Sequence, residues 1–299
     1  MITKEETIRQ STNTFNKWRD IWDANTKENK CNYTKPTKNI IGFGTKRRLI
    51  LFAFGPSFAD NLAKVKAQKL HYDHDIMVVD KALGPVLEAG IIPNYVITAD
   101  AHMRLEDSIN LETFNPKLCK KITLISCVLS NPSWATFWKE NGGDTYFYIN
   151  KDGIRTHHRY GKTFNFDPEK GEIDAFLLPA ATNVANSGFV FSTLLLGYKE
   201  IFLCGFNYSW DMFGSYYGTE KRDSTHRHLN VDKRISDNHI TMLGIGNKLV
   251  QTSSSMMFSA RWLTGFILKV EKELGVRTIN LTGRGLIRIP FQAILKEAA

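Results

Sequence analysis

The sequence predicts an α/β fold, in which a Rossmann-like, largely parallel, doubly wound sheet follows an N-terminal helical arm. Two observations lead to this prediction. Short runs that are apolar at almost every position, such as LILFAF and DIMVVD, alternate with stretches of helical periodicity. Strands that are apolar throughout are buried on both faces, which is typical of parallel sheets covered by helices.

The predicted elements follow one another in a regular order along the chain. Strands are expected at 49–54, 75–80, 95–100, 122–128, 145–150 and 201–206, with a strand-like run at 174–180 and a last strand and short helix within 276–298. Helices are expected at 57–70, 81–90, 183–197 and, as one long helical region, 240–274. Alternation of strands and helices with short links is the pattern of a doubly wound domain.

The first part of the chain is predicted to be a separate piece. Residues 1–47 are interpreted as a helical arm and basic linker, because Phe15, Trp18 and Trp22 recur at helical spacing before a polar stretch broken by proline and glycine. Residues 48–299 then form the Rossmann-like catalytic domain. It is expected to carry an insertion near 150–175 and a polar, histidine-rich active-site loop near 207–239.

Composition narrows the class of protein. The 299 residues carry 39 basic and 30 acidic side chains, a formal net charge of +9 that favours acidic partners. We expect no membrane span, because no window holds eighteen uninterrupted apolar residues, and no secretory signal, because MITKEETIRQ has no apolar core. Four scattered cysteines without CxxC spacing indicate a reducing, cytoplasmic location.

The turn after the first strand is the main candidate binding element. Gly55, Pro56 and Ser57 end an apolar run and open a helix. Glycine lets backbone approach a ligand, proline suits a first helical turn, and backbone amides with the helix dipole favour an anion. The turn is neither a GxGxxG fingerprint nor a P-loop. A tight strand–helix turn with a capping serine explains the same residues.

Two carboxylates end the next two strands. Asp80 closes MVVD and Asp100 closes VITAD. In open α/β sheets ligands bind at the carboxyl ends of strands, so these side chains suit a ribose hydroxyl, a Mg²⁺ ion or an acceptor. Each aspartate is equally suited to cap the helix that follows it.

Several segments together resemble a known superfamily. AFGPSF, VVDKALGPVLEAGIIPNYVITAD, NVANSGFVFSTLLLGYKEIFLCGFNYSWD and HRHLN, in this order, resemble the MptE-like superfamily over about residues 48–285. That superfamily includes archaeal 6-hydroxymethyl-dihydropterin pyrophosphokinase and motility-associated flagellin glycosyltransferases. The turn also resembles that of bacterial CMP-sialic acid sialyltransferases, which typically reads Gly-Asn-Gly-Pro-Ser, whereas this chain has Ala53-Phe54-Gly55-Pro56-Ser57.

The resemblance implies a nucleotide site in which Gly55, Pro56 and Ser57 cradle phosphates near Asp80 and Asp100. Two asparagines in ATNVANSG also fit this site, since Asn183 and Asn186 open a helix and could contact a base or ribose, or merely cap the helix.

The loop at 207–239 and the end of the strand at 95–100 supply the candidate catalytic groups. His226, His228 and Asp100 are the candidates for activating an acceptor hydroxyl, and Arg227 is a candidate for binding the leaving phosphate. A solvated basic loop is the alternative. A zinc site is not favoured, because HxH with a distant third histidine lacks a second cluster.

These residues favour a glycosyltransferase that uses a nucleotide-sugar donor of CMP or UDP type. No cofactor is then required. The positive charge, to which Arg277, Arg284 and Arg288 contribute, favours a polyanionic acceptor such as a hydroxylated base in DNA. A protein or glycan acceptor is equally open. The alternative is an ATP-dependent, MptE-like pyrophosphokinase with Mg²⁺ on Asp80 and Asp100. A nucleotide-binding module without catalysis is a third class.

Overall fold

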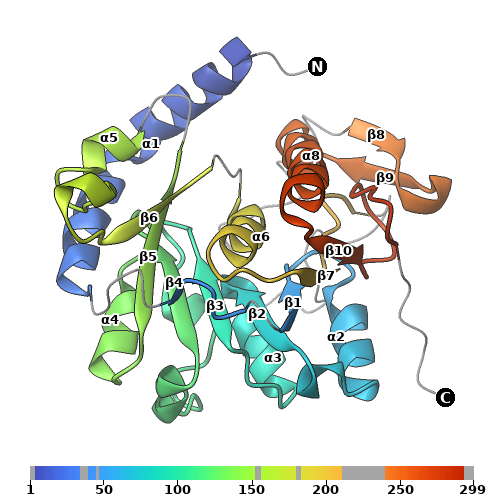
Figure 1. Ribbon diagram of the computed structural model, residues 1–299, viewed down its shortest axis with the longest axis horizontal. Coiled ribbons are helices and arrows are strands. Elements are labelled where there is room, and N and C mark those ends of the chain that lie inside the picture. The colour runs from blue at the N-terminus through green and yellow to red at the C-terminus, as the bar shows by residue number, and fades with distance from the viewer. Residues whose placement is uncertain are drawn as a thin grey trace.

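The computed structural model describes residues 4–33, 40–44, 47–151, 156–179, 183–210 and 240–292. These residues build an eight-stranded sheet flanked by helices (Figure 1). Its strands are β1 (Arg48–Phe52), β2 (Asp75–Val79), β3 (Tyr95–Thr98), β4 (Thr123–Cys127), β5 (Thr145–Asn150), β6 (Ala175–Leu178), β7 (Glu200–Cys204) and β10 (Arg277–Asn280). The helices are α1 (Lys4–Cys31), α2 (Phe58–Ala67), α3 (Leu83–Glu88), α4 (Ser133–Glu140), α5 (Thr156–Tyr160), α6 (Val184–Leu194) and α8 (Ser254–Leu274).

All eight strands run parallel in the order β10-β7-β1-β2-β3-β4-β5-β6, which confirms the predicted fold class. The chain first builds the sheet from β1 toward β6 and then returns to place β7 on the other side of β1. Phe52 at the end of β1 therefore pairs with Val78 of β2 on one side and with Cys204 of β7 on the other. This reversal creates a topological switch point, where the carboxyl ends of parallel strands leave room for a ligand.

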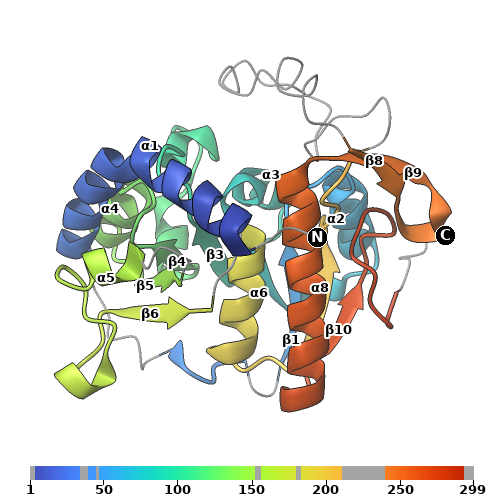
Figure 2. The same cartoon turned by 90° about the horizontal axis from the view of Figure 1, so that it is seen from above.

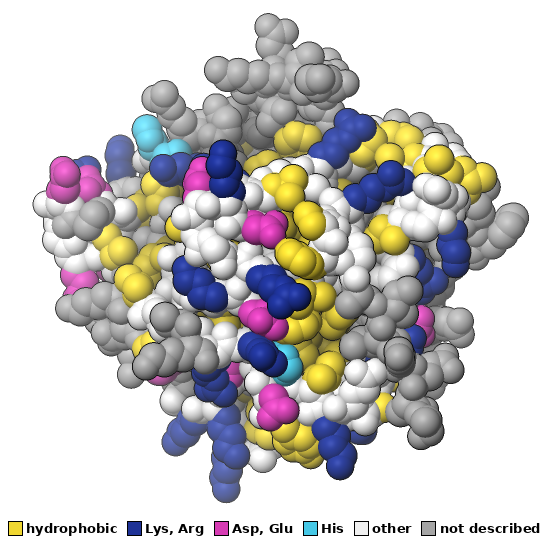
Figure 3. Space-filling view, turned by 45° about the vertical axis from the view of Figure 1, so that its right-hand side comes forward, with side chains coloured by type: hydrophobic (Ala, Val, Ile, Leu, Met, Phe, Trp, Pro, Cys, Tyr) yellow, Lys and Arg dark blue, Asp and Glu magenta, His cyan; other side chains and the backbone are white. Residues whose placement is uncertain are grey.

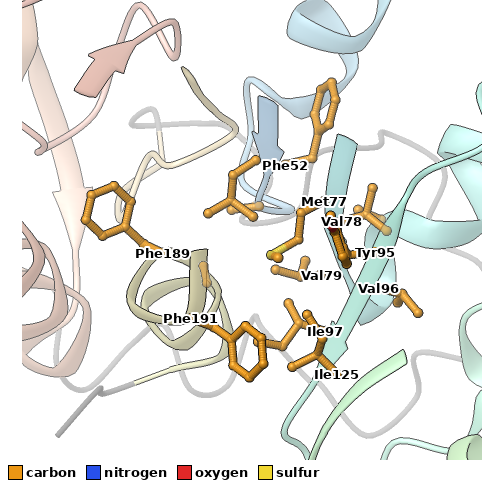
Figure 4. Close-up of a cluster of buried hydrophobic side chains, with 14 of the residues drawn as sticks. Phe52, Met77, Val78, Val79, Tyr95, Val96, Ile97, Ile125, Phe189 and Phe191 are labelled. Atoms are coloured by element: carbon orange, nitrogen blue, oxygen red, sulfur yellow. The ribbon is translucent and has the colours of Figure 1, made fainter. Parts of the chain in front are cut away.

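Helices cover both faces of the sheet, as the uniformly apolar strands require. Helices α2 and α3 lie on one face, while α6 and α8 lie on the other (Figure 2). Phe191 of α6 lies beside Ile97 of β3 and Ile125 of β4, whereas Phe189 points the other way and packs edgewise on Phe266 of α8; both phenylalanines are fully buried (Figure 4). No helix in the described part of the chain combines the length and hydropathy needed to cross a bilayer.

Helix α1 extends into the polar stretch after Trp22 that was expected to be a linker, and it is attached to the sheet. It continues through Cys31, and its last turns bind the loops that follow β3 and β4. The Asn25 side-chain amide donates to the carbonyls of Ala101 and Leu129, each at 3.1 Å. The Asn29 amide donates to Val128 and Ser130. Residues expected to form a polar linker thus fasten α1 across the carboxyl edge of the sheet.

The expected helix over 240–274 is wrong in its first third. Residues Ile240–Leu243 (β8) and Leu249–Thr252 (β9) form an antiparallel hairpin, and α8 begins only after Ser253. Two features break the helix. Gly246 takes a left-handed φ of 69° in the connecting turn, and the Ser253 hydroxyl accepts the amide N–H of Met256 as an N-cap.

Candidate active site

A cleft of about 840 Å³ opens at the carboxyl edge of the sheet, at the switch point. Its floor consists of the segments that follow β1, β2, β3, β4, β5 and β7, and α1 and α8 line it as well. A volume of this order holds a small-molecule ligand with room for a second group. The cleft lies at the edge of the sheet that carries the ends of β1, β2 and β3, and Gly55, Asp80 and Asp100 line it.

The Gly-Pro-Ser turn is held by the segment that follows β7, and the N–H groups of Gly55 and Ser57 are already hydrogen-bonded to it. The Gly55 N–H donates to the carbonyl of Gly205 at 3.0 Å, and the Ser57 N–H donates to Asn207 Oδ1 at 3.0 Å. Pro56 has no N–H to offer. The Ser57 hydroxyl also donates to Asn207 Oδ1, at 2.9 Å, and Ser57 is only 2% exposed. Gly55 and Pro56 line the cleft, whereas the predicted phosphate contact through the Ser57 amide and hydroxyl is not available in this arrangement.

Close backbone packing explains both glycines at this corner. A Cβ on Gly55 would lie 2.4 Å from the carbonyl oxygen of Gly205. A Cβ on Gly205 would lie 2.2 Å from the carbonyl oxygen of Ala53, and Gly205 also has a φ of 73°. The glycine of the turn therefore serves the contact between β1 and β7, a role that sequence alone does not separate from ligand approach.

Two of the arginines expected to attract a polyanion are tied to the fold. The Arg284 guanidinium donates to the carbonyl of Pro56 at 2.9 Å, and Arg288 donates to the carbonyls of Leu243 and Gly244. Figure 3 shows one face of the molecule, on which lysine and arginine side chains are spread among hydrophobic and acidic ones. The positive charge on this face is dispersed.

Asp80 and Asp100 both line the cleft, in different environments. Asp80 is 5% exposed, and burial raises its pKa to about 6, with a further contribution from the negative charge of Asp100. The backbone N–H of Lys81 and the Lys81 charge oppose this rise. Asp100 is exposed, and its Oδ1 accepts the His102 N–H at 2.8 Å. The two carboxylates thus interact across neighbouring strand ends.

The two predicted asparagines serve the structure differently. Asn183 lines the cleft and caps α6, because its side-chain oxygen accepts the Asn186 N–H at 2.9 Å. Asn186 is fully buried, donating to the carbonyl of Ser259 and accepting from the Tyr208 hydroxyl. Asn186 therefore joins α6 to α8 behind the cleft and has no surface with which to contact a nucleotide.

The predicted catalytic loop residues His226, Arg227 and His228 lie outside the described residues. His102, which follows Asp100, is exposed and packs against Trp18 of α1, with ring centroids 4.0 Å apart. No group of three or more His, Cys, Asp or Glu residues within the described ranges lies close enough together to hold a metal ion.

Several cleft residues escaped the sequence reasoning. Lys81 and Lys151 are the cationic residues among the described lining of the cleft. Trp18 and Trp22 of α1 and Trp262 of α8 line it too. The helical spacing of the first two tryptophans was visible in the sequence, but it indicates only a buried helix face. Which element that face meets depends on where α1 docks.

Comparison with known proteins identifies the family. The family described as "6-hydroxymethylpterin diphosphokinase MptE-like" matches residues 23–212, well over half of the chain. The chain belongs to the MptE-like family. The matched region of this MptE-like protein contains β1 to β7 and therefore the whole floor of the cleft. No curated protein matches it.

The fold of this MptE-like protein is also found among solved structures. The MAf glycosyltransferase from Magnetospirillum magneticum AMB-1 superimposes with a TM-score of 0.54 at 15% sequence identity. The alignment covers 89% of this chain and 38% of that protein. The chain thus spans less than half the length of the neighbour, and at this identity the similarity establishes the fold.

Proposed function

We propose that this protein is a transferase that binds a nucleotide-activated donor in the cleft, and that the group it transfers is a sugar. The observation that supports this most is the position of the cleft, which lies at the switch point beside β1 and β7 and is lined by two carboxylates and two lysines. Nucleotides bind at this position in doubly wound sheets. The family and the fold shared with a MAf glycosyltransferase are consistent with the proposal.

The donor phosphates need a binding partner other than the N–H groups of the Gly-Pro-Ser turn, which are already hydrogen-bonded. Because the N–H groups of Gly55 and Ser57 donate to Gly205 and Asn207 in the segment after β7, phosphate charge needs other partners. Lys81 follows β2, the strand next to β1, and is the lysine nearest the switch point. Ammonium groups are effective phosphate ligands. In this proposal Lys81 binds the donor phosphates, and Gly55 and Pro56 shape the surface beside them.

Acceptor activation is assigned to the exposed carboxylate of Asp100. It remains in contact with solvent at the mouth of the cleft, whereas Asp80 lies beneath it. A carboxylate that accepts the proton of an acceptor hydroxyl makes that oxygen a better nucleophile for the sugar carbon, while the nucleotide leaves with its phosphate. His226 and His228 remain candidates for the same role.

A second reaction is favoured by the interaction of Asp80 with Asp100. Two carboxylates at neighbouring strand ends, where the charge of Asp100 helps to raise the pKa of Asp80, suit Mg²⁺, which prefers oxygen ligands and usually binds one or two carboxylates together with substrate phosphates. Mg²⁺ would supply charge neutralisation for diphosphoryl transfer from ATP. This alternative corresponds to the activity that the family description prints.

Thermal unfolding with CMP, UDP, GDP and ATP, each with and without Mg²⁺, tests the proposal. A ligand that binds only the native state raises the melting temperature, by about 2.7 kcal/mol of stability at a hundredfold excess over Kd. Stabilisation by CMP or UDP without Mg²⁺ supports sugar transfer. Stabilisation by ATP only with Mg²⁺ supports diphosphoryl transfer. A chain that no nucleotide stabilises would contradict both reactions.

DNA as acceptor receives less support than the sequence suggested. Arg284 and Arg288, which were expected to face a polyanion, hold backbone carbonyls instead. The hypothesis is tested by the salt dependence of binding to duplex DNA, since each phosphate contact contributes a slope of about −0.9 in log affinity against log salt. Affinity that does not fall with salt would eliminate a DNA acceptor bound through phosphates.

A further inference from the structure

The cleft has two parts. Its floor lies within the residues that match the family, and its two walls, formed by α1 and α8, lie outside them. The floor, from Ala53 to Ser209, falls within the matched residues 23–212. The wall from α1 precedes residue 23 and the wall from α8 follows residue 212. Their lining residues are Thr14, Trp18, Trp22, Ser255, Met256, Phe258, Ser259 and Trp262. We therefore expect the floor to bind the donor, and we expect the walls to determine which acceptor this chain binds.

The walls are aromatic and uncharged along their described lining. Trp18, Trp22 and Trp262 are each half-buried, so part of each ring is accessible at the cleft. Two of the three indole rings pack against a neighbouring aromatic side chain. Trp18 packs edgewise on His102 at 4.0 Å and 64°, and Trp262 stacks on Phe266 at 5.1 Å and 8°. The indole surfaces are therefore already oriented before any ligand arrives.

The attachment of α1 keeps its wall in place. Asn25 and Asn29 donate to loop carbonyls, and the Arg159 guanidinium forms two hydrogen bonds with the carboxylate of Asp23 on α1. These contacts lie within two to three helical turns of Trp18 and Trp22. The tryptophans thus belong to the rigid body of the site.

This chemistry selects one class of ligand. A nucleic-acid backbone would bring phosphate charge against walls whose described lining offers no cation. A pyranose ring, in contrast, has an apolar face of C–H groups that covers an indole and a rim of hydroxyls that suits serine and threonine. Thr14 and Ser255, both exposed, belong to the same lining as the tryptophans. A neutral sugar ring therefore matches both the apolar and the polar parts of the walls.

We propose that Trp18, Trp22 and Trp262 form an acceptor subsite for a neutral sugar ring. This inference rests on the proposed function, because it places the acceptor hydroxyl beside a donor bound at the switch point. It assigns the acceptor to the carbohydrates and not to nucleic acid or an unmodified peptide.

Saturation-transfer NMR on the full chain tests the subsite. The probes are the methyl glycosides of glucose, galactose, mannose and N-acetylglucosamine, each with CMP or UDP present, and a serine-containing peptide and a short DNA duplex serve for comparison. We expect ring C–H signals from at least one glycoside. Trp18→Ala and Trp262→Ala should each weaken its affinity about 3- to 10-fold, the range of one aromatic contact. Trp18→Phe, which keeps a ring, should retain most of it.

Tyr72→Ala is the matched control, because Tyr72 is an aromatic residue 75% exposed in the segment between α2 and β2 and is not part of the cleft lining. It should leave glycoside binding unchanged. Thermal unfolding with nucleotide reports separately on the donor site and should be unaffected in the tryptophan variants, which also shows that they fold.

The outcomes separate the two proposals. Failure of every nucleotide to stabilise the wild-type chain contradicts the proposed function. Normal nucleotide stabilisation with no glycoside signal that depends on the tryptophans overturns the subsite alone. A tryptophan-dependent signal from the peptide or the duplex, and not from a glycoside, overturns it as well.

Discussion

Replacing Asp80 with Asn should stabilise the protein above neutral pH and remove part of its pH dependence. Asp80 is 5% exposed, and its pKa is raised from 3.8 to about 6, chiefly by burial. A shift of about 2 pH units corresponds to about 3 kcal/mol at about 1.4 kcal/mol per unit. Because the folded pKa is the higher one, the folded state binds the proton more tightly. The charged carboxylate therefore destabilises the fold as pH rises from about 4 to above 6.

The assay is urea unfolding of both proteins across pH 4 to 8. At each pH the free energy of unfolding of Asp80→Asn is subtracted from that of wild type. This difference should fall by up to about 3 kcal/mol over the range, with most of the change between pH 4 and 6.5. Asp73→Asn is the matched control, because Asp73 is exposed and a surface substitution should change the free energy of unfolding by no more than about 0.5 kcal/mol. A flat difference curve for Asp80→Asn would refute the argument that burial opposes ionisation at this site.

Three further predictions follow from particular contacts. Gly55→Ala should destabilise the fold by about 1–3 kcal/mol in urea unfolding, because its Cβ would lie 2.4 Å from the Gly205 carbonyl, and unchanged stability would contradict the close approach. Lys81→Met should weaken the affinity for a nucleoside diphosphate about tenfold or more, measured by calorimetry, and leave the affinity for the nucleoside unchanged. Lys66→Met, on the exposed face of α2, is the control and should change neither affinity. Equal losses of affinity in both variants would refute a direct phosphate contact by Lys81. Asn29→Ala should speed amide hydrogen exchange in the second half of α1, since it removes donors to two buried carbonyls, and unaltered exchange would show that α1 is held by other contacts.

Local pattern was sufficient for the sheet. Every strand of the parallel sheet overlaps a run that the sequence indicated, with β1 and β7 each beginning one residue earlier, at Arg48 and Glu200. The central strands could be indicated because a strand buried on both faces is apolar at successive positions. The same reasoning placed Asp80 and Asp100 at one edge, since carboxyl ends of parallel strands meet there. The hairpin at 240–252 was missed, because residues of β8 such as Ile240 and Met242 alternate only briefly and a short apolar run fits helix or strand.

The roles of individual site residues depended on contacts between segments far apart in the chain. Ser57 was expected to meet an anion, but Asn207, 150 positions away, occupies its amide and its hydroxyl. Asn186 shares its local pattern with Asn183, and only the packing of α8 and Tyr208 around it makes it a buried structural residue. No spacing rule within either segment contains that information.

The apolar strands, the alternation with helices and the carboxylates at strand ends were written into short stretches of sequence, because burial and backbone geometry act there over a few residues. Only the tertiary structure decided where α1 docks, that the segment after β7 braces the Gly-Pro-Ser turn, and that Trp18 and Trp262 line one cleft. Each depends on which hydrogen-bond acceptors and apolar surfaces the folded sheet leaves exposed for a distant segment, and these exist only once the sheet has formed.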